Sequence, residues 1–328
     1  MQNRHIYHTL ILLIIWLAAC EPLAPAPAPQ VIIVTPVPSS TPLPTATPEA
    51  TRTPLPTPTP DYTPTATPFP CEAEGGTMLA FDDFRSEVAG ENLRYRVYIP
   101  PCYLETQKRY PYTILLHGQG YDEIQWDRLG IDEALDQGIR LGAVAPMILV
   151  MPYTGSIANR DSFPPSASYE TVILDELVPA IERDFCTWNQ AQYRAIGGIS
   201  RGGFWAYSIA LRHPDIFGKA GAHSAVFDEG NAPAAFNPLD LALNSSFLEE
   251  ANLRLYLDNA ASDLAGEGQR LFSSRLSARG IPHTYLIHPV GDHSEDYWQA
   301  HVTEYLAFYA RDWPRSVSEL PGCLQPSP

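Results

Sequence analysis

The chain has 328 residues, of which 45% are hydrophobic, and its formal net charge is -16 at pH 7. An acidic surface disfavours nucleic acids and anionic membrane faces as partners, because like charges repel. Beyond an N-terminal signal and linker, the length allows one α/β domain with a full core and no second domain.

The first twenty residues have the pattern of a bacterial lipoprotein signal peptide. Arg4 precedes an apolar run over residues 10–17, which is too short for a membrane-spanning helix. The run ends in the tetrad LAAC at residues 17–20, which resembles the bacterial lipobox. We therefore expect residues 1–20 to be the signal region and Cys20 to carry the lipid. An ordinary cleaved signal and an uncleaved anchor are the alternatives, and both also export the domain.

Residues 21–70 consist mainly of proline, threonine and alanine. This composition leaves little apolar surface to bury, so we expect a disordered stalk. In polyproline II, at about 3.1 Å per residue, the stalk would hold the domain up to on the order of 100 Å from its anchor. A proline-motif ligand or an O-glycosylated stem is the alternative. The apolar tetrad VIIV at residues 31–34 is too short to cross a membrane.

Residues 71–328 have the pattern of a single α/β domain. Alternating and short apolar runs predict strands at 77–81, 93–99, 112–116, 145–151, 193–199, 220–224, 253–257 and 284–288. Helical spacing predicts helices at 168–184, 201–212, 269–279 and 297–311. Two antiparallel strands followed by β–α units predict a mostly parallel sheet with helices on both faces and functional loops at the carboxyl ends of its strands. Residues 228–250 show no clear period, so a surface loop or a lid is expected there.

The motif G-x-S-x-G occurs at residues 198–202, between the strand at 193–199 and the helix at 201–212. In this context it is typical of the nucleophile elbow, a strained turn that exposes a serine and needs small residues beside it. Ser200 is therefore the candidate nucleophile. The alternative is a glycine-rich turn that only packs tightly, but such a turn needs no acid and histidine later in the chain.

An acid and then a histidine follow the nucleophile in hydrolases of this kind. Asp258 and Asp263 follow the strand at 253–257, and His293 follows the strand at 284–288. The other histidines lie within strands or helices, at the end of a helix, in the turn after the third strand, or in the signal. His293 alone is therefore placed to meet Ser200. The order predicts a catalytic triad in which either aspartate can orient the imidazole.

The turn HGQG at residues 117–120 closes the third strand of the domain. Its backbone N–H groups should lie beside those that follow the nucleophile, where they can bind an oxyanion. We expect the N–H groups of Gln119 and Arg201 to do this, and His117 to organise the turn. The side chain of Arg201 either faces an anionic substrate or bonds to neighbouring loops, and the second role is favoured.

Four cysteines remain when Cys20 is assigned to the lipid, and an even number in an exported domain predicts two disulfides. We expect Cys102 to pair with Cys186, since both would lie at the sheet edge opposite the active site. Cys71 and Cys323 flank the domain and are expected to pair with each other. No cysteine lies in a C-x-x-C pair, so neither a zinc site nor a redox site is expected.

These motifs together resemble the bacterial esterase family that includes esterase D, feruloyl and acetylxylan esterases, and enterochelin esterase. The resemblance spans residues 77–313 and rests on PPCY before RYP at 100–111, the HG turn at 117–118, RAIGGISRGG at 194–203, and GDH at 291–293 with Trp298 behind it. It implies an α/β-hydrolase fold. Where the family commonly shows G-x-x-D, this chain has AASD at 260–263. Asp263 is therefore the favoured acid, while the missing glycine leaves Asp258 open.

The resemblance also implies a reaction. Ser200 would attack an ester carbonyl, His293 would take its proton, and water would release the acyl-enzyme without a metal or an organic cofactor. Expected substrates are esters outside the cell, such as acetylated or feruloylated plant polysaccharide or a siderophore ester, and the lipid would hold the enzyme at the membrane surface. Acyl transfer to a carbohydrate and a non-catalytic surface binding protein are the alternatives.

Overall fold

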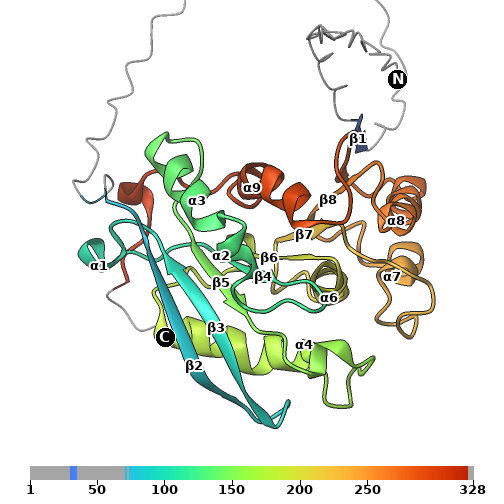
Figure 1. Cartoon of the computed structure of the whole chain (residues 1–328), viewed down its shortest axis with the longest axis horizontal. Helices are drawn as coiled ribbons and strands as arrows, with labels where there is room; N and C mark the ends of the chain where they lie inside the picture. The colour runs from blue at the N-terminus through green and yellow to red at the C-terminus, as the bar shows by residue number, and fades with distance from the viewer. Residues whose placement is uncertain (1–29, 35–70, 72–73, 324–328) are drawn as a thin grey trace, which may run out of the picture.

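A computed structural model describes residues 30–34, 71 and 74–323 of the chain (Figure 1). The predicted signal region, the lipidation residue Cys20 and most of the predicted stalk lie outside the described residues. Among the helices that are described, none is long and apolar enough to span a bilayer.

The centre of the described domain is a nine-stranded sheet with the strand order β1-β9-β8-β7-β6-β4-β5-β3-β2. Its strands are β1 Gln30–Val34, β2 Thr77–Ser86, β3 Glu91–Ile99, β4 Tyr112–Leu116, β5 Ile148–Pro152, β6 Arg194–Ile199, β7 Lys219–His223, β8 Arg254–Ala260 and β9 His283–His288. The neighbouring strands β5, β4, β6, β7, β8 and β9 are all paired in parallel. Strands β2 and β3 at one edge and β1 at the other join by antiparallel pairing. The predicted mostly parallel sheet is confirmed.

Helices cover both faces of this sheet (Figure 1). They are α1 Tyr103–Thr106, α2 Gln125–Arg128, α3 Ile131–Arg140, α4 Tyr169–Thr171, α5 Val178–Asp184, α6 Arg201–Ala210, α7 Pro238–Asn244, α8 Gly266–Ala278 and α9 Glu295–Tyr309, and a π-helical stretch over Val172–Leu177 joins α4 to α5. The side chains of β4 alternate between two buried clusters, because successive residues of a strand point to opposite faces. One cluster includes side chains of α5, α6, α7 and α8, and the other includes those of α2, α3 and α9.

Four described helices occur where no helix was predicted: the short helices α1 and α2 and the longer helices α3 and α7. Helix α3 buries Ile131, Leu135 and Gly138, a narrow stripe on an otherwise polar helix, so its apolar signal is weak. Helix α7 lies within residues 228–250, begins at Pro238 and is capped by the side chain of Asn237. Its buried leucines belong to the core, so this segment is a packed part of the fold.

Strand β1 corrects the expectation that the whole segment 21–70 is disordered. Gln30–Val34 pairs antiparallel with β9, in a register that sets Gln30 opposite Ile287 and Val34 opposite His283. A strand at the edge of a sheet leaves one row of backbone groups unpaired, and β-branched residues favour the extended conformation that can pair with it. The apolar tetrad of the stalk has this composition.

The predicted disulfide pairing is wrong. Cys71 bonds to Cys102, and Cys186 bonds to Cys323. The first bond follows from the β2–β3 hairpin, in which Thr77 lies opposite Ile99, so the segments before β2 and after β3 meet. The second follows from the C-terminal segment, which runs beside residues 107–110 and thus reaches the residues after α5. Local strand pairing, not position at the ends of the domain, decides which cysteines meet.

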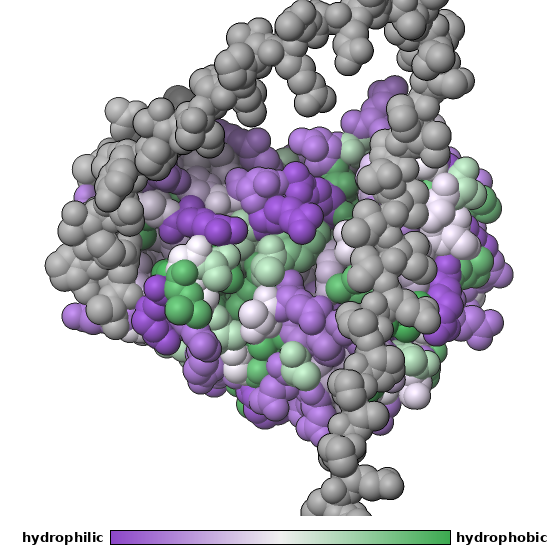
Figure 2. Space-filling model, turned by 90° about the horizontal axis from the view of Figure 1, so that it is seen from above, coloured by the Kyte–Doolittle hydropathy of each residue, from purple (hydrophilic) through white to green (hydrophobic). Residues whose placement is uncertain are grey.

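The surface of the domain is mixed in character. Figure 2 shows one face, on which hydrophilic residues surround small groups of hydrophobic ones.

Candidate active site

Ser200 lies in a strained turn between β6 and α6. Its φ of 54° and ψ of -116° place a non-glycine residue in a region of backbone conformation that side chains disfavour. The turn is stabilised by hydrogen bonds on both sides: the N–H of Ser200 donates to the carbonyl of His223, and its carbonyl accepts from the N–H of Phe204. Ser200 is partly exposed at the carboxyl end of β6, where it can be reached from solvent.

The glycines of the motif are required by close backbone approach. A Cβ at Gly198 would lie 2.3 Å from the carbonyl carbon of Gly202. A Cβ at Gly202 would lie 2.5 Å from the carbonyl oxygen of His117, in the turn after β4. Both separations are far below contact distance, so only glycine allows the two turns to pack against each other.

A chain of two hydrogen bonds connects Ser200 to an aspartate. The Oγ of Ser200 lies 3.0 Å from Nε2 of His293, and Nδ1 of His293 lies 2.8 Å from Oδ1 of Asp263. An imidazole with its proton on Nδ1 donates to the carboxylate and leaves Nε2 to accept the serine hydroxyl. The structure therefore brings together Ser200, His293 and Asp263, the favoured of the two candidate acids, in an arrangement that can move a proton from the serine to the imidazole.

The environment of Asp263 keeps its carboxyl group ionised. Burial by itself would raise its pKa, but the hydrogen bonds from His293 and from the N–H of Ala265 (2.8 Å) act in the opposite direction. The net result is a pKa below the usual value for aspartate. An ionised Asp263 can hold the imidazole in place and stabilise its protonated form.

Asp258, the other candidate acid, does not reach His293. It is fully buried at the end of β8 and accepts hydrogen bonds from Nδ1 of His223 (2.7 Å) and from the hydroxyls of Tyr297 (2.6 Å) and Tyr305 (2.9 Å). These contacts occupy both of its oxygens. Asp263, although it lacks the glycine common in the family, is the aspartate placed at the histidine.

The turn after β4 lies directly beside Ser200. A Cβ at Gly118 would lie 3.6 Å from the Cβ of Ser200. The N–H of Gly118 donates to Oε1 of Gln125, which pins the turn. Within the described residues, the N–H groups of Gln119 and Arg201 donate no hydrogen bond, so both remain available to an oxygen atom bound next to the serine.

His117 has the organising role expected for it. Its Nε2 accepts from the N–H of Thr154 (2.9 Å), and its Nδ1 donates to the carbonyl of Gly118 (2.8 Å). Burial lowers the pKa of His117, in keeping with a neutral ring that accepts at Nε2 and donates at Nδ1.

The side chain of Arg201 bonds to a neighbouring loop, which was the favoured expectation. Its Nε donates to the carbonyl of Ala158 (3.2 Å), and a terminal nitrogen pairs with Asp161 at 2.8 Å. Its guanidinium also lies over the rings of Phe204 and Trp205. The charge is thus used to fix the loop after β5 against α6.

An aromatic group supports the histidine from behind. The ring of Trp298 meets that of His293 edge-on at a centroid distance of 5.2 Å, and its indole N–H donates to the hydroxyl of Ser224 (2.9 Å). Tyr121 meets Trp298 edge-on at 6.4 Å. Trp298 was included in the sequence motif, whereas Tyr121 and Ser224 carried no signal that would have selected them.

Comparisons with known proteins place this geometry in a family. The chain matches the family model "Esterase: Putative esterase" over residues 86–309. An endo-1,4-beta-xylanase/feruloyl esterase of Xylanibacter ruminicola is 35% identical over 147 residues, which cover 41% of this chain and 20% of that protein. An esterase of Mycobacterium tuberculosis is 30% identical over 255 residues, which cover 64% of this chain and 54% of that protein. The chain therefore spans about a fifth and about half of the lengths of these two relatives.

Among solved structures, a ferulic acid esterase is similar with a TM-score of 0.65 and 24% identity, over 72% of this chain and 99% of that chain. At this identity the likeness concerns the fold, which is that of the α/β-hydrolases, as predicted.

Proposed function

Because the chain belongs to the esterase family, we propose that it is a serine hydrolase of carboxylic esters with Ser200 as nucleophile, His293 as general base and acid, and Asp263 as the residue that orients the imidazole. The observation that carries this proposal is the continuous hydrogen-bonded chain from Ser200 through His293 to Asp263, which begins on a strained turn. A serine in a merely structural turn needs neither the strain nor the buried carboxylate.

The reaction follows from the contacts. Oγ of Ser200 attacks the ester carbonyl carbon while Nε2 of His293 takes the hydroxyl proton. The protonated imidazole, stabilised by Asp263, gives this proton to the leaving alkoxide, and an acyl-serine ester remains. His293 then takes a proton from water, the resulting hydroxide attacks the acyl group, and the carboxylic acid leaves with Ser200 restored.

The negative charge that forms on the carbonyl oxygen needs donors that are already in place. We assign this role to the N–H groups of Gln119 and Arg201, which flank the serine and are otherwise unused in the described part of the chain. Removing one such donor from a hydrolase typically lowers turnover about 10²- to 10³-fold. Both donors are backbone groups, so the side chains at these positions are not needed for this role.

For the substrate we propose acyl esters of carbohydrates, with feruloyl and acetyl groups as the leading acyl classes. Support comes from the printed activities of the xylanase/feruloyl esterase relative and of the similar ferulic acid esterase structure. We further propose that the domain acts outside the cell, held to the membrane by lipid on Cys20. Two disulfides in the described domain agree with an oxidising compartment.

The proposal is tested with the purified full chain in two steps. A fluorophosphonate probe should label the wild type at Ser200 and leave Ser200→Ala unlabelled, and hydrolysis of p-nitrophenyl acetate should be lost in the same variant. A panel of methyl ferulate, feruloylated arabinoxylan, acetylated xylan and a siderophore ester then ranks the substrates by kcat/KM. Wild-type turnover equal to that of Ser200→Ala on all of these esters would overturn the assignment.

A further inference from the structure

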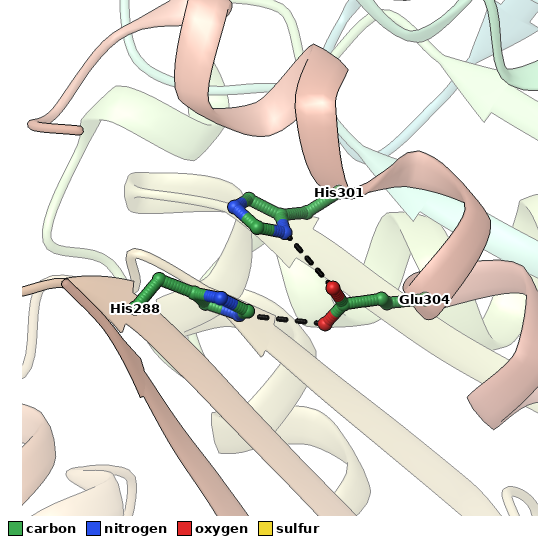
Figure 3. A group of neighbouring side chains, drawn as sticks. All are labelled: His288, His301 and Glu304. Carbon is green, nitrogen blue, oxygen red and sulfur yellow. Dashed lines mark hydrogen bonds and ion pairs between the residues drawn. The ribbon is translucent and has the colours of Figure 1, made fainter. Parts of the chain in front are cut away.

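One group of side chains outside the triad has the composition of a metal site. His288, the last residue of β9, faces His301 and Glu304, which lie at i and i+3 on α9 (Figure 3). Each residue offers one ligand atom, and these atoms all lie within 4.8 Å of one another. From this cluster we infer that His288, His301 and Glu304 bind a divalent transition-metal ion of the zinc class and thereby clamp the end of β9 to α9.

The distances between the ligand atoms agree with a shared ion. Nδ1 of His301 lies 3.1 Å from Oε1 of Glu304, and Nε2 of His288 lies 3.4 Å from Oε2 of the same carboxylate. Ligands of a tetrahedral zinc ion at bond lengths of about 2.0–2.1 Å are separated by about 3.3 Å. The two separations run to different oxygens of Glu304, and all three ligand atoms lie within 4.8 Å of one another, so the side chains need to rotate to share one ion.

The second observation is a buried imidazole nitrogen whose contact with Glu304 is too long and poorly aligned for a good hydrogen bond. His288 is only 5% exposed, and among the described residues its Nε2 has the 3.4 Å contact with Oε2 of Glu304 but no well-formed hydrogen bond. A buried polar atom without a well-formed hydrogen bond destabilises the folded state. A metal ion bound at Nε2 satisfies that lone pair, whereas the hydrogen-bonded histidines elsewhere in the core have no such need.

The donor set selects the kind of ion. Two imidazoles and one carboxylate match the ligands of open zinc sites, whereas calcium and magnesium prefer oxygen donors throughout. The side chain of Glu304 is 44% exposed and also lines a cavity of about 620 Å³, so an ion can enter from solvent. The strongly acidic chain attracts cations in addition. The sequence expectation of no metal rested on cysteine spacing and on the cofactor-free serine mechanism, and it weighed these histidines only as partners for Ser200.

The position of the cluster suggests what a bound ion does: it restrains the loop that carries His293. Residues 289–294 connect β9 to α9 and contain His293, and the proposed ligands stand on either side of this loop. The ring of Tyr297 lies between loop and cluster, 4.6 Å from the ring of His301, while its hydroxyl bonds to Asp258. An ion that fixes β9 to α9 therefore restrains the loop that presents His293. These residues are positioning residues in this scheme, because none of them contacts Ser200.

Metal binding is tested on the purified full chain after removal of metals with EDTA and dialysis. Titration with zinc should show one ion per chain, and cobalt should produce the strong visible absorption of a low-symmetry, four-coordinate site. His301→Ala and Glu304→Gln should each weaken zinc binding at least about tenfold. His213→Ala is the matched control, because His213 also faces a glutamate, Glu170 (2.8 Å), but has no second histidine beside it. Binding should not change in this control.

A second readout examines the clamp itself. Zinc should slow hydrogen–deuterium exchange in residues 289–294 of the wild type and leave it unchanged in Glu304→Gln, a conservative variant that preserves the fold even if His301→Ala does not. The inference is overturned if zinc binds the wild type no more tightly than Glu304→Gln, or if exchange in the loop is insensitive to zinc. Both readouts are independent of ester hydrolysis, so their outcome is separate from that of the proposed function.

Discussion

Replacing Asp263 by asparagine separates the two candidate acids. In the structure Oδ1 of Asp263 accepts from both His293 and the N–H of Ala265, and the hydroxyl of Ser224 also stabilises the ionised carboxylate. An asparagine whose oxygen stays at the Oδ1 position keeps both contacts but loses the negative charge. One whose amide turns toward His293 donates to Nδ1 and stabilises the tautomer that cannot accept the serine proton.

Both orientations lower turnover, by amounts that can be estimated. Loss of an ionised acceptor is worth about 3 kcal/mol, or about 10²-fold in rate. The wrong tautomer costs about 10⁴-fold in the known triads. We therefore expect Asp263→Asn to lower kcat/KM by between about 10² and 10⁴, measured with p-nitrophenyl acetate at neutral pH.

Asp258→Asn is the control and should change stability instead. Its carboxylate accepts from two tyrosine hydroxyls at Oδ2, and an amide nitrogen there would face two donors. With hydrogen bonds to a charged group worth about 1.5–3 kcal/mol each, the free energy of unfolding should fall by about 3 kcal/mol or more, while kcat/KM stays within about tenfold of the wild type. If Asp258→Asn damages turnover more than Asp263→Asn does, the assignment of the triad acid is refuted.

The stability difference between the wild type and Asp263→Asn should depend on pH. The pKa of Asp263 is lower in the folded protein than its usual 3.8, so folding favours the ionised form. The resulting stability is fully present above that value and is lost as the pH falls through the folded pKa. The difference in unfolding free energy between wild type and Asp263→Asn should therefore shrink on acidification from about pH 6 to pH 3. A difference that grows toward low pH would contradict the pKa direction.

Three further predictions concern the nucleophile, the disulfides and the anchor. Ser200→Ala and His293→Ala should each lower kcat by at least about 10⁴. The double variant should lower it little further, because the effects of residues that act as one unit are not additive. Full additivity in the same ester assay would count against a shared proton path. Replacing Cys186 and Cys323 together by serine removes a disulfide that spans 137 residues and should lower the free energy of unfolding, measured in urea, by up to about 5 kcal/mol. Peptide mapping that finds these two cysteines unpaired would contradict the structure. Cys20→Ala should release the protein from membranes after alkaline washing, and undiminished partitioning would exclude lipid on this residue.

The site residues that could be predicted are those marked by a short sequence motif or by their order along the chain. Ser200 could be identified because the strained turn forces glycines at fixed spacing, and His293 because topology orders the loops at the carboxyl ends of parallel strands. The choice between Asp258 and Asp263 could not be made from five residues of sequence. It depends on which side chain turns toward His293, and the tyrosines that hold Asp258 come from α9, far along the chain.

Long-range pairings set the limit for the fold as well. Strands β2 to β9 and helices α5, α6, α8 and α9 follow from periodicity, whereas the disulfide partners depend on the register of the β2–β3 hairpin and on where the C-terminal segment lies. The polar helix α3 carries too narrow an apolar stripe to stand out. The apolar tetrad in the proline-rich segment could not be predicted as a strand, because its partner is the edge strand β9, more than 200 residues later in the chain.

Strand β1 changes the reach of an anchored enzyme. For a chain held at Cys20, only residues 21–29 separate the lipid from the first residue paired with the domain. An extended chain of this length covers on the order of 35 Å, about a third of the reach expected from the uninterrupted segment. If Cys20 carries a lipid as proposed, the pairing of β1 with β9 would shorten the tether between the bilayer and the domain, and release of β1 would lengthen it without any change in the rest of the fold.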